Sequence, residues 1–217
     1  MRNKTSILHK VGKFLLIVSF VLQLLLLAVQ YTGFFATLAR SSGSLSWLTS
    51  FKDTIGVAAY IGWGSCATQF FLIRLFTMQQ RGESSTRNSY LLLCVASCIY
   101  HHWYLIRALF KGYSFGFGDI ASLVFGLGLT LMILVAIMLN HRLLGLICAI
   151  IALAQAGWDI YALSSLYRLM SAAPVTIILI CELLYDLGLC FCCAGIKAMR
   201  PAANSMATPP ETVEEKA

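Results

Sequence analysis

Residues 181–193 read CELLYDLGLCFCC and place two carboxylates, Glu182 and Asp186, one helical turn apart inside an apolar run. Between Arg168 and Lys197 these two acids are the only charged residues. Such a run predicts a membrane-spanning helix, in which each acid costs about 2.5–3.5 kcal/mol while each large apolar residue returns only about 0.3–0.6 kcal/mol. The helix therefore needs polar neighbours, and we expect the bundle that contains it to have a polar interior.

The composition of the whole chain fits a membrane protein. Of its 217 residues, 59% are hydrophobic and 12% are charged, and the mean hydropathy is +0.80. The formal charge of +7 does not indicate nucleic-acid binding, because the basic residues gather at the ends of apolar runs. All eight cysteines lie inside apolar segments, so the sequence predicts no disulfide framework. It also predicts no metal site and no cofactor.

Counting runs of about 20 apolar residues predicts an all-α polytopic membrane protein with a six-helix bundle. The predicted spans are 14–39, 54–78, 89–110, 118–139, 143–167 and 175–199. The domain plan is then a basic amino terminus at 1–13, a membrane domain at 14–199 and a disordered polar tail at 200–217.

The basic residues also predict the orientation of the chain. With six spans, eleven of the 16 Lys and Arg residues lie on the side of the two termini. Cytoplasmic loops carry the excess of positive charge. We therefore expect a multi-pass protein of the cytoplasmic (plasma) membrane with both termini in the cytoplasm.

Two patterns of small residues concern helix packing. Gly118, Ser122 and Gly126 recur every four residues, which favours close approach of another helix. That helix belongs either to this chain or to a partner subunit, which includes a second copy. The sequences IGWG at 61–64 and AGWD at 156–159 indicate either a three-plus-three inverted repeat or a chance recurrence of small residues.

Ionisable and aromatic residues share one layer in the predicted outer half of the membrane. From the helical rise of 1.5 Å, they lie about 9–18 Å from the outer ends of their spans. Helical spacing also groups Cys94 with Cys98, and Gln155 with Asp159, on small polar faces that we expect to point inward. The predicted substrate-binding residues are Trp63, His101, Trp158, Asp159, Glu182, Tyr185 and Asp186.

This layer favours a pocket, open to the outside, for a small cationic or protonatable solute. The carboxylates would attract a cation, the aromatic rings would stack on it and His101 would move protons. The leading hypothesis is thus a membrane protein that binds or transports such a solute. The alternatives are an accessory subunit whose acids form structural hydrogen bonds, such as Asp159 with His101, and a membrane enzyme using these groups as acid and base.

Two carboxylates one turn apart repel each other when both are ionised. We therefore expect Glu182 and Asp186 to hold one proton between them while the site is empty. A bound cation would release this proton, so its affinity should increase with pH.

Overall fold

The computed structural model describes residues 2–38, 63–81, 85–112, 114, 116–166 and 172–196. All regular elements among these residues are helices, which confirms the predicted all-α class. They are α1 (Arg2–Leu38), α3 (Trp63–Arg81), α4 (Arg87–His101), α5 (Trp103–Phe110), α6 (Phe117–Ser122), the π-helix η2 (Leu123–Gly128), α7 (Leu129–Leu139), α8 (Arg142–Leu166) and α9 (Ala172–Ala194).

Four helical stretches are long and apolar enough to cross a membrane, and the bent pair α4–α5 would make a fifth. The four are Ile7–Ala28, Phe117–Leu139, Arg142–Ser164 and Thr176–Ala194. The predicted second span is not among them; its first part, 54–62, lies outside the described residues. Six spans are therefore not confirmed. Residues 2–13 form the first part of α1, and the tail at 200–217 lies outside the described residues.

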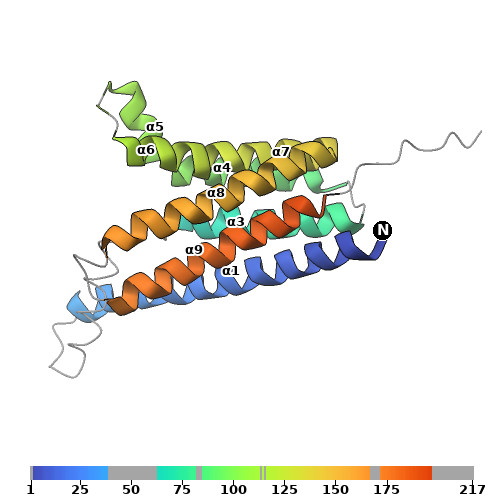
Figure 1. Ribbon diagram of the computed structural model, residues 1–217. Helices are drawn as coiled ribbons and strands as arrows, with labels where there is room; N and C mark the ends of the chain where they lie inside the picture. The colour runs from blue at the N-terminus through green and yellow to red at the C-terminus, as the bar shows by residue number, and fades with distance from the viewer. Residues whose placement is uncertain are drawn as a thin grey trace, which may run out of the picture.

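The helices form a ring in which neighbours in the sequence are neighbours in space (Figure 1). α1 packs against α3 and α9, α8 packs against α9 and α7, and α3 packs against α4. Contacts of α4 with η2 and α7 close the ring. The amino terminus of α1 and the carboxyl end of α9 lie at the same end of the bundle, which we call the terminal end; the opposite end is the distal end (Figure 1).

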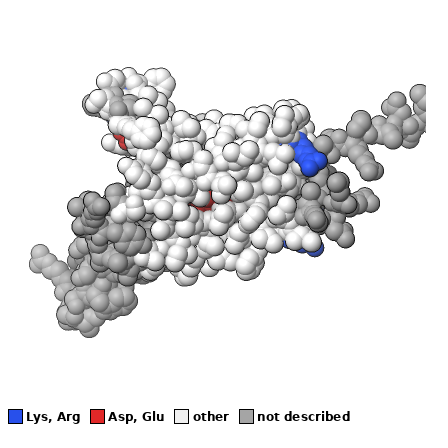
Figure 2. All heavy atoms as spheres, in the orientation of Figure 1, with Lys and Arg blue, Asp and Glu red and all other residues white. Residues whose placement is uncertain are grey.

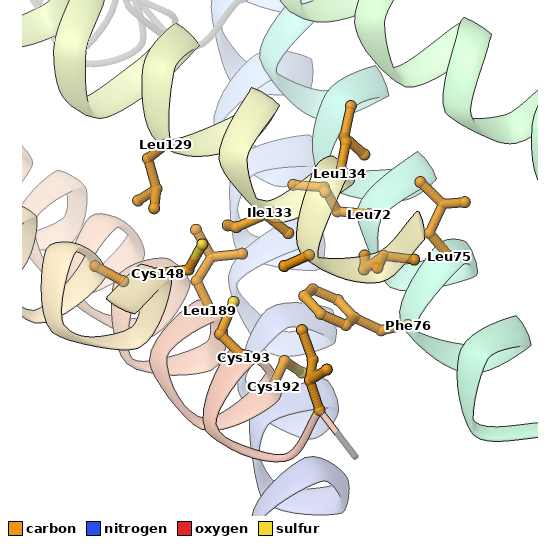
Figure 3. Packing of buried hydrophobic residues seen from close by; sticks show 14 of the residues in the cluster. Leu72, Leu75, Phe76, Leu129, Ile133, Leu134, Cys148, Leu189, Cys192 and Cys193 are labelled. Carbon is orange, nitrogen blue, oxygen red and sulfur yellow. The ribbon is translucent and has the colours of Figure 1, made fainter. Parts of the chain in front are cut away.

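The interior is apolar toward the terminal end (Figure 3). Phe76 of α3, Ile133 of α7 and Leu189 of α9 are completely or almost completely buried there. Cys192 and Cys193 belong to the same cluster, and like the other cysteines they are free thiols. Buried cysteine packs as a small apolar side chain, so this half of the bundle serves as the hydrophobic core.

The seam between α1 and α9 depends on close approach of the two backbones. A Cβ at Gly188 would lie 2.8 Å from Cγ of Leu16, and one at Gly12 would lie 2.6 Å from the backbone nitrogen of Cys192. Ser19 adds a hydrogen bond from its Oγ to the carbonyl of Cys181, at 2.9 Å. Small residues allow this contact in a membrane helix pair, so the seam fixes α9 and its two acids against the bundle.

The outer surface is apolar along the helices. Leu92 of α4 is 71% exposed and Ile150 of α8 is 69% exposed, and many other large apolar side chains point outward. Figure 2 shows this surface largely without charged atoms, with basic atoms gathered mainly at the terminal end. Contiguous apolar surface of this size is rare on soluble proteins, and it fits contact with lipid tails.

The predicted third span, 89–110, is not one continuous helix. It breaks at His102, and α5 bends away from α4 by 64°. No proline or glycine explains the break. His102 itself leaves the helical conformation, with φ −93° and ψ 7°, and its Nδ1 lies 2.9 Å from the carbonyl oxygen of Cys98, which already accepts the backbone N–H of His102 in the ordinary helical bond. A side chain that bonds into the helix ladder is a recognised cause of a kink.

The ring of His102 faces a second irregularity, the π-helix η2. A Cβ at Gly126 would overlap the His102 imidazole, so only glycine admits the ring at this point. π-Helical turns are rare and often occur at functional sites. The break in α4 and the π-turn before α7 therefore form one tertiary contact.

Candidate functional site

The candidate site contains three carboxyl groups on two adjacent helices. Asp159 lies on α8, whereas Glu182 and Asp186 lie one turn apart on α9. The carboxyl group of Asp159 is close enough to act electrostatically on both Glu182 and Asp186. Figure 2 shows acidic atoms in the middle of the otherwise apolar face, well away from both ends. The packing of α8 against α9 thus brings together acids that lie on two separate spans in the sequence.

Asp186 is the most enclosed of the three acids. It has no exposed surface, and the group that its carboxylate oxygens meet among the described residues is the carboxyl group of Asp159, which can donate to them only when it carries a proton. Asp159 and Glu182 are each partly exposed. A buried polar group without a partner costs about 1–3 kcal/mol, and more when it is charged. Asp186 therefore needs a proton, a water molecule or a cation to compensate it.

Two further side chains present oxygen acceptors without a donor near the level of Asp186. Nε2 of Gln69 donates to the carbonyl of Leu16 at 3.1 Å, which leaves its buried Oε1 without a partner. Leu16 lies against Gly188, two residues from Asp186, so Gln69 occupies a similar level in the bundle. Oε1 of Gln155, one turn before Asp159, is also buried without a partner. Within the described part of the chain, the interior thus offers acceptors from α3 and α8, and two facing acids, without a permanent donor for them.

Tyr185 connects the acids to α4. Its side chain is partly buried, and it lies close to Glu182 and Asp186 on its own helix and to Cys94 and Cys98 of α4. Both cysteines are buried, as the predicted polar face of this span requires. The phenol is therefore directed across the bundle, where its ring can contact a cation held by the acids.

The two histidines take different positions. His101 is partly buried at the end of α4, and Gly64 of α3 packs against its Cβ and backbone. His102 is buried, and the rings of the two residues meet edge to face at 4.7 Å. The sequence left open a bond between Asp159 and His101 as an example of a structural network. Among the described residues, no ion pair joins these two side chains, and Asp159 neighbours the acids of α9 instead.

The two predicted site tryptophans lie near the distal end. Trp63 is 59% exposed at the start of α3. The ring of Trp158 contacts the rings of Phe117 at 5.3 Å and Tyr161 at 5.7 Å. Aromatic side chains of this kind gather at membrane interfaces, and a role in solute binding stays a prediction for both tryptophans.

The small-residue stripe has different surroundings along its length. Gly118 is exposed, and a Cβ there would meet nothing within 4 Å. Ser122 is partly buried at the end of α6, and Gly126 packs against His102 inside the chain. One of the three residues therefore supports an internal contact, while a partner for Gly118 stays a prediction.

Neither Gln69 nor the pairing of His102 with Gly126 was singled out from the sequence, although Gly126 itself was predicted as a packing residue. Gln69 is a polar residue in an apolar span, a signal that could have indicated an inward position. The contact between His102 and Gly126 joins two spans and has no signal in either one alone. Among the described residues, no three His, Cys, Asp or Glu side chains are arranged to hold a metal ion. No family model, curated protein or solved structure matches this chain.

Proposed function

We propose that the protein binds a small organic cation or protonatable amine inside its helix bundle, as a solute-binding or transport protein of the plasma membrane. The observation that carries this proposal is Asp186, which is fully buried and has no partner among the described residues except the carboxyl group of Asp159, another acid. Intramembrane ionisable residues commonly mark pathways for ions or substrates. Asp159 and Glu182 stand beside it, so three carboxyl groups meet at the same place.

The chemistry of the acceptors defines the class of ligand. A primary ammonium carries three donors and a positive charge, and the interior offers carboxylate and amide oxygens that lack donors. Tyr185 adds an aromatic ring beside the acids, which suits the alkyl groups and the charge of an amine. Primary amines should therefore bind more tightly than quaternary ammonium ions of similar size, which have charge but no donor.

Access to the site is consistent with the arrangement of the acids. Glu182 and Asp159 are partly exposed, whereas Asp186 is enclosed between α9 and the rest of the bundle. A cation that reaches the less buried acids would exchange its hydration for contacts with their oxygens. In this scheme Asp159 and Glu182 attract the ligand, and Asp186 makes the most desolvated contact.

A thermal-shift screen of the detergent-purified protein tests the proposal. A ligand that binds only the folded state raises the melting temperature by mass action. We expect primary amines to raise it and Asp186→Asn to weaken their binding about tenfold or more, because hydrogen bonds to charged groups contribute about 1.5–3 kcal/mol. The matched control is Asp119→Asn, a change of acid to amide at the start of α6, where Asp119 caps the backbone N–H of Gly116.

The control should leave every ligand-induced shift unchanged. If no amine raises the melting temperature of the wild-type protein, the interior acceptors are satisfied by water or protons and the proposal is wrong. If amines stabilise wild type and Asp186→Asn equally, binding occurs elsewhere and Asp186 is not part of the site. A cooperative unfolding transition, measured for both variants before and after the screen, confirms that each is folded.

A further inference from the structure

The short helix α5 makes few contacts with the rest of the bundle in the described part of the chain. None of its eight residues is buried. Phe110 is 87% exposed, Tyr104 is 79% exposed and Trp103 is 54% exposed. An isolated helix of this length is not stable in water, and its apolar residues need a medium that covers them. The surface of α5 therefore requires an occupant that the bundle does not supply.

The position and direction of α5 indicate what that occupant is. It lies at the distal end of the bundle and points to the side of it (Figure 1). Its axis makes an angle of 64° with α4, so it runs closer to the membrane plane than to the membrane normal if α4 crosses the bilayer. Exposed Trp and Tyr side chains at the end of a bundle are typical of the interface between lipid tails and headgroups.

The charges of α5 are of one sign. Segment 103–112 contains Arg107 and Lys111 and no acidic residue, and both cations are exposed. They are four residues apart, so they share one face of the helix and its last turn. A basic face beside exposed aromatic and aliphatic side chains is the pattern of a helix that lies in the membrane interface.

We propose that α5 is an interfacial helix that binds anionic phospholipid headgroups at the distal surface of the membrane. Arg107 and Lys111 contact the lipid phosphates, while Trp103 and Phe110 enter the boundary between headgroups and acyl chains. This inference is independent of the solute site, because it uses none of the acids of α8 and α9. It also gives the bend at His102 a role, because the bend turns α5 from the membrane normal toward the membrane plane.

Tryptophan depth measurements test the orientation in the full-length chain reconstituted into lipid vesicles. One variant keeps Trp103 as its only tryptophan, and a second replaces Trp103 by Phe and places the only tryptophan at position 110. Quenching by lipids brominated at different depths should place the two tryptophans at depths that differ by about 5 Å. This value follows from seven residues of 1.5 Å rise along a helix inclined at 64°. A straight continuation of α4 would separate them by about 10 Å. The tryptophans replaced by Phe in both variants are Trp47, Trp63 and Trp158.

The same vesicles test lipid selectivity. Brominated phosphatidylglycerol should quench Trp103 more strongly than brominated phosphatidylcholine at equal mole fraction. Each cation should contribute a local enrichment of the anionic lipid of about fivefold at low salt. Arg107→Gln combined with Lys111→Gln should remove the preference, and high salt should reduce it in the wild type. Arg142→Gln, which removes an exposed cation at the terminal end, is the matched control and should leave the preference intact.

Three results would overturn this inference. Equal quenching by the two lipids means that α5 does not bind anionic headgroups. A depth difference near 10 Å means that α5 continues a membrane span. Quenching of Trp103 by aqueous iodide, with no quenching by brominated lipid, means that the helix lies outside the bilayer and that another protein is the natural cover of its apolar face.

Discussion

Gly126→Ala is expected to destabilise the protein because the new methyl group would occupy the position of the His102 imidazole. The ring would have to move away from η2, and it would lose the bond between Nδ1 and the carbonyl of Cys98. Overpacking costs about 1–3 kcal/mol and the lost bond about 1 kcal/mol. Replacing glycine by alanine in a helix returns about 1 kcal/mol. The net loss in the free energy of unfolding should be about 1–3 kcal/mol.

Gly118→Ala is the matched control, since it makes the same change in the same predicted span. A Cβ at Gly118 meets no atom within 4 Å, so the variant should be neutral or more stable by up to about 1 kcal/mol. Equilibrium unfolding in mixed micelles of dodecyl maltoside and dodecyl sulfate, followed by circular dichroism, measures both variants. The difference between them should be about 1–4 kcal/mol if the contact is formed as described.

A double-mutant cycle identifies the partner of Gly126. His102→Ala removes the ring, so adding Gly126→Ala to that variant should cost almost nothing. The coupling free energy should then equal most of the loss seen in the single Gly126 variant, about 1–3 kcal/mol. The reasoning is refuted if Gly126→Ala and Gly118→Ala unfold at the same detergent composition. It is equally refuted if the cost of Gly126→Ala stays the same when His102 is absent.

Two further predictions concern orientation and pH. A cytoplasmic reporter fused after Arg81 should be active, and a reporter that is active only outside the cell should work after Gly112; the opposite pair of activities would reverse the predicted topology. The affinity for a non-titrating quaternary ammonium ion should increase with pH, because a bound cation displaces a proton from the acids of α8 and α9. An affinity that is constant from pH 5 to pH 8, measured by isothermal titration, would exclude this proton exchange.

The bounds of several helices could be predicted from the sequence because apolar runs and tight connections are local signals. The predicted spans 118–139 and 143–167 correspond closely to Phe117–Leu139 and Arg142–Ser164. The turn between them contains Asn140, which takes the left-handed conformation at the end of α7. Asparagine tolerates this conformation better than most residues. Here local chemistry and hydropathy indicate the same boundary.

The bend at His102 could not be predicted in the same way. The segment contains no proline or glycine near the break, and its hydropathy suits one continuous span. The cause is a bond from the His102 ring to the carbonyl of Cys98 together with a contact on Gly126, which belongs to another helix. A contact between spans has no periodic signature within either span, so only the three-dimensional arrangement reveals it.

The candidate site was predictable in its composition but not in its pairings. The cost of two acids in one apolar run already indicates that they need polar neighbours. Helical spacing also placed Gln155 and Asp159 on one face of their span. Which helix that face meets depends on the order of helices around the ring. That order brings Asp159 to Glu182 and Asp186 of α9, whereas the sequence alone allowed it to pair with His101.

Asp186→Leu distinguishes a ligand site from a structural network, because the two assign opposite signs to the change in stability. The partner that the described residues offer Asp186 is the carboxyl group of Asp159, which can share a hydrogen bond with it only when one of the two carries a proton, and Asp186 is completely enclosed. Replacing a buried charged group by an apolar residue of similar volume is often neutral or stabilising by about 1–4 kcal/mol. We therefore expect the ligand-free variant to be at least as stable as the wild type and to lose amine binding.

Ser19→Ala provides the contrast, since it removes a hydroxyl that does have a partner, the carbonyl of Cys181. That variant should lose about 1 kcal/mol and keep its ligand binding. If Asp186→Leu instead destabilises the protein by more than Ser19→Ala does, the contact between Asp186 and Asp159 is a structural bond of the folded chain. The acids would then hold the helices together, and the proposed solute site would be wrong.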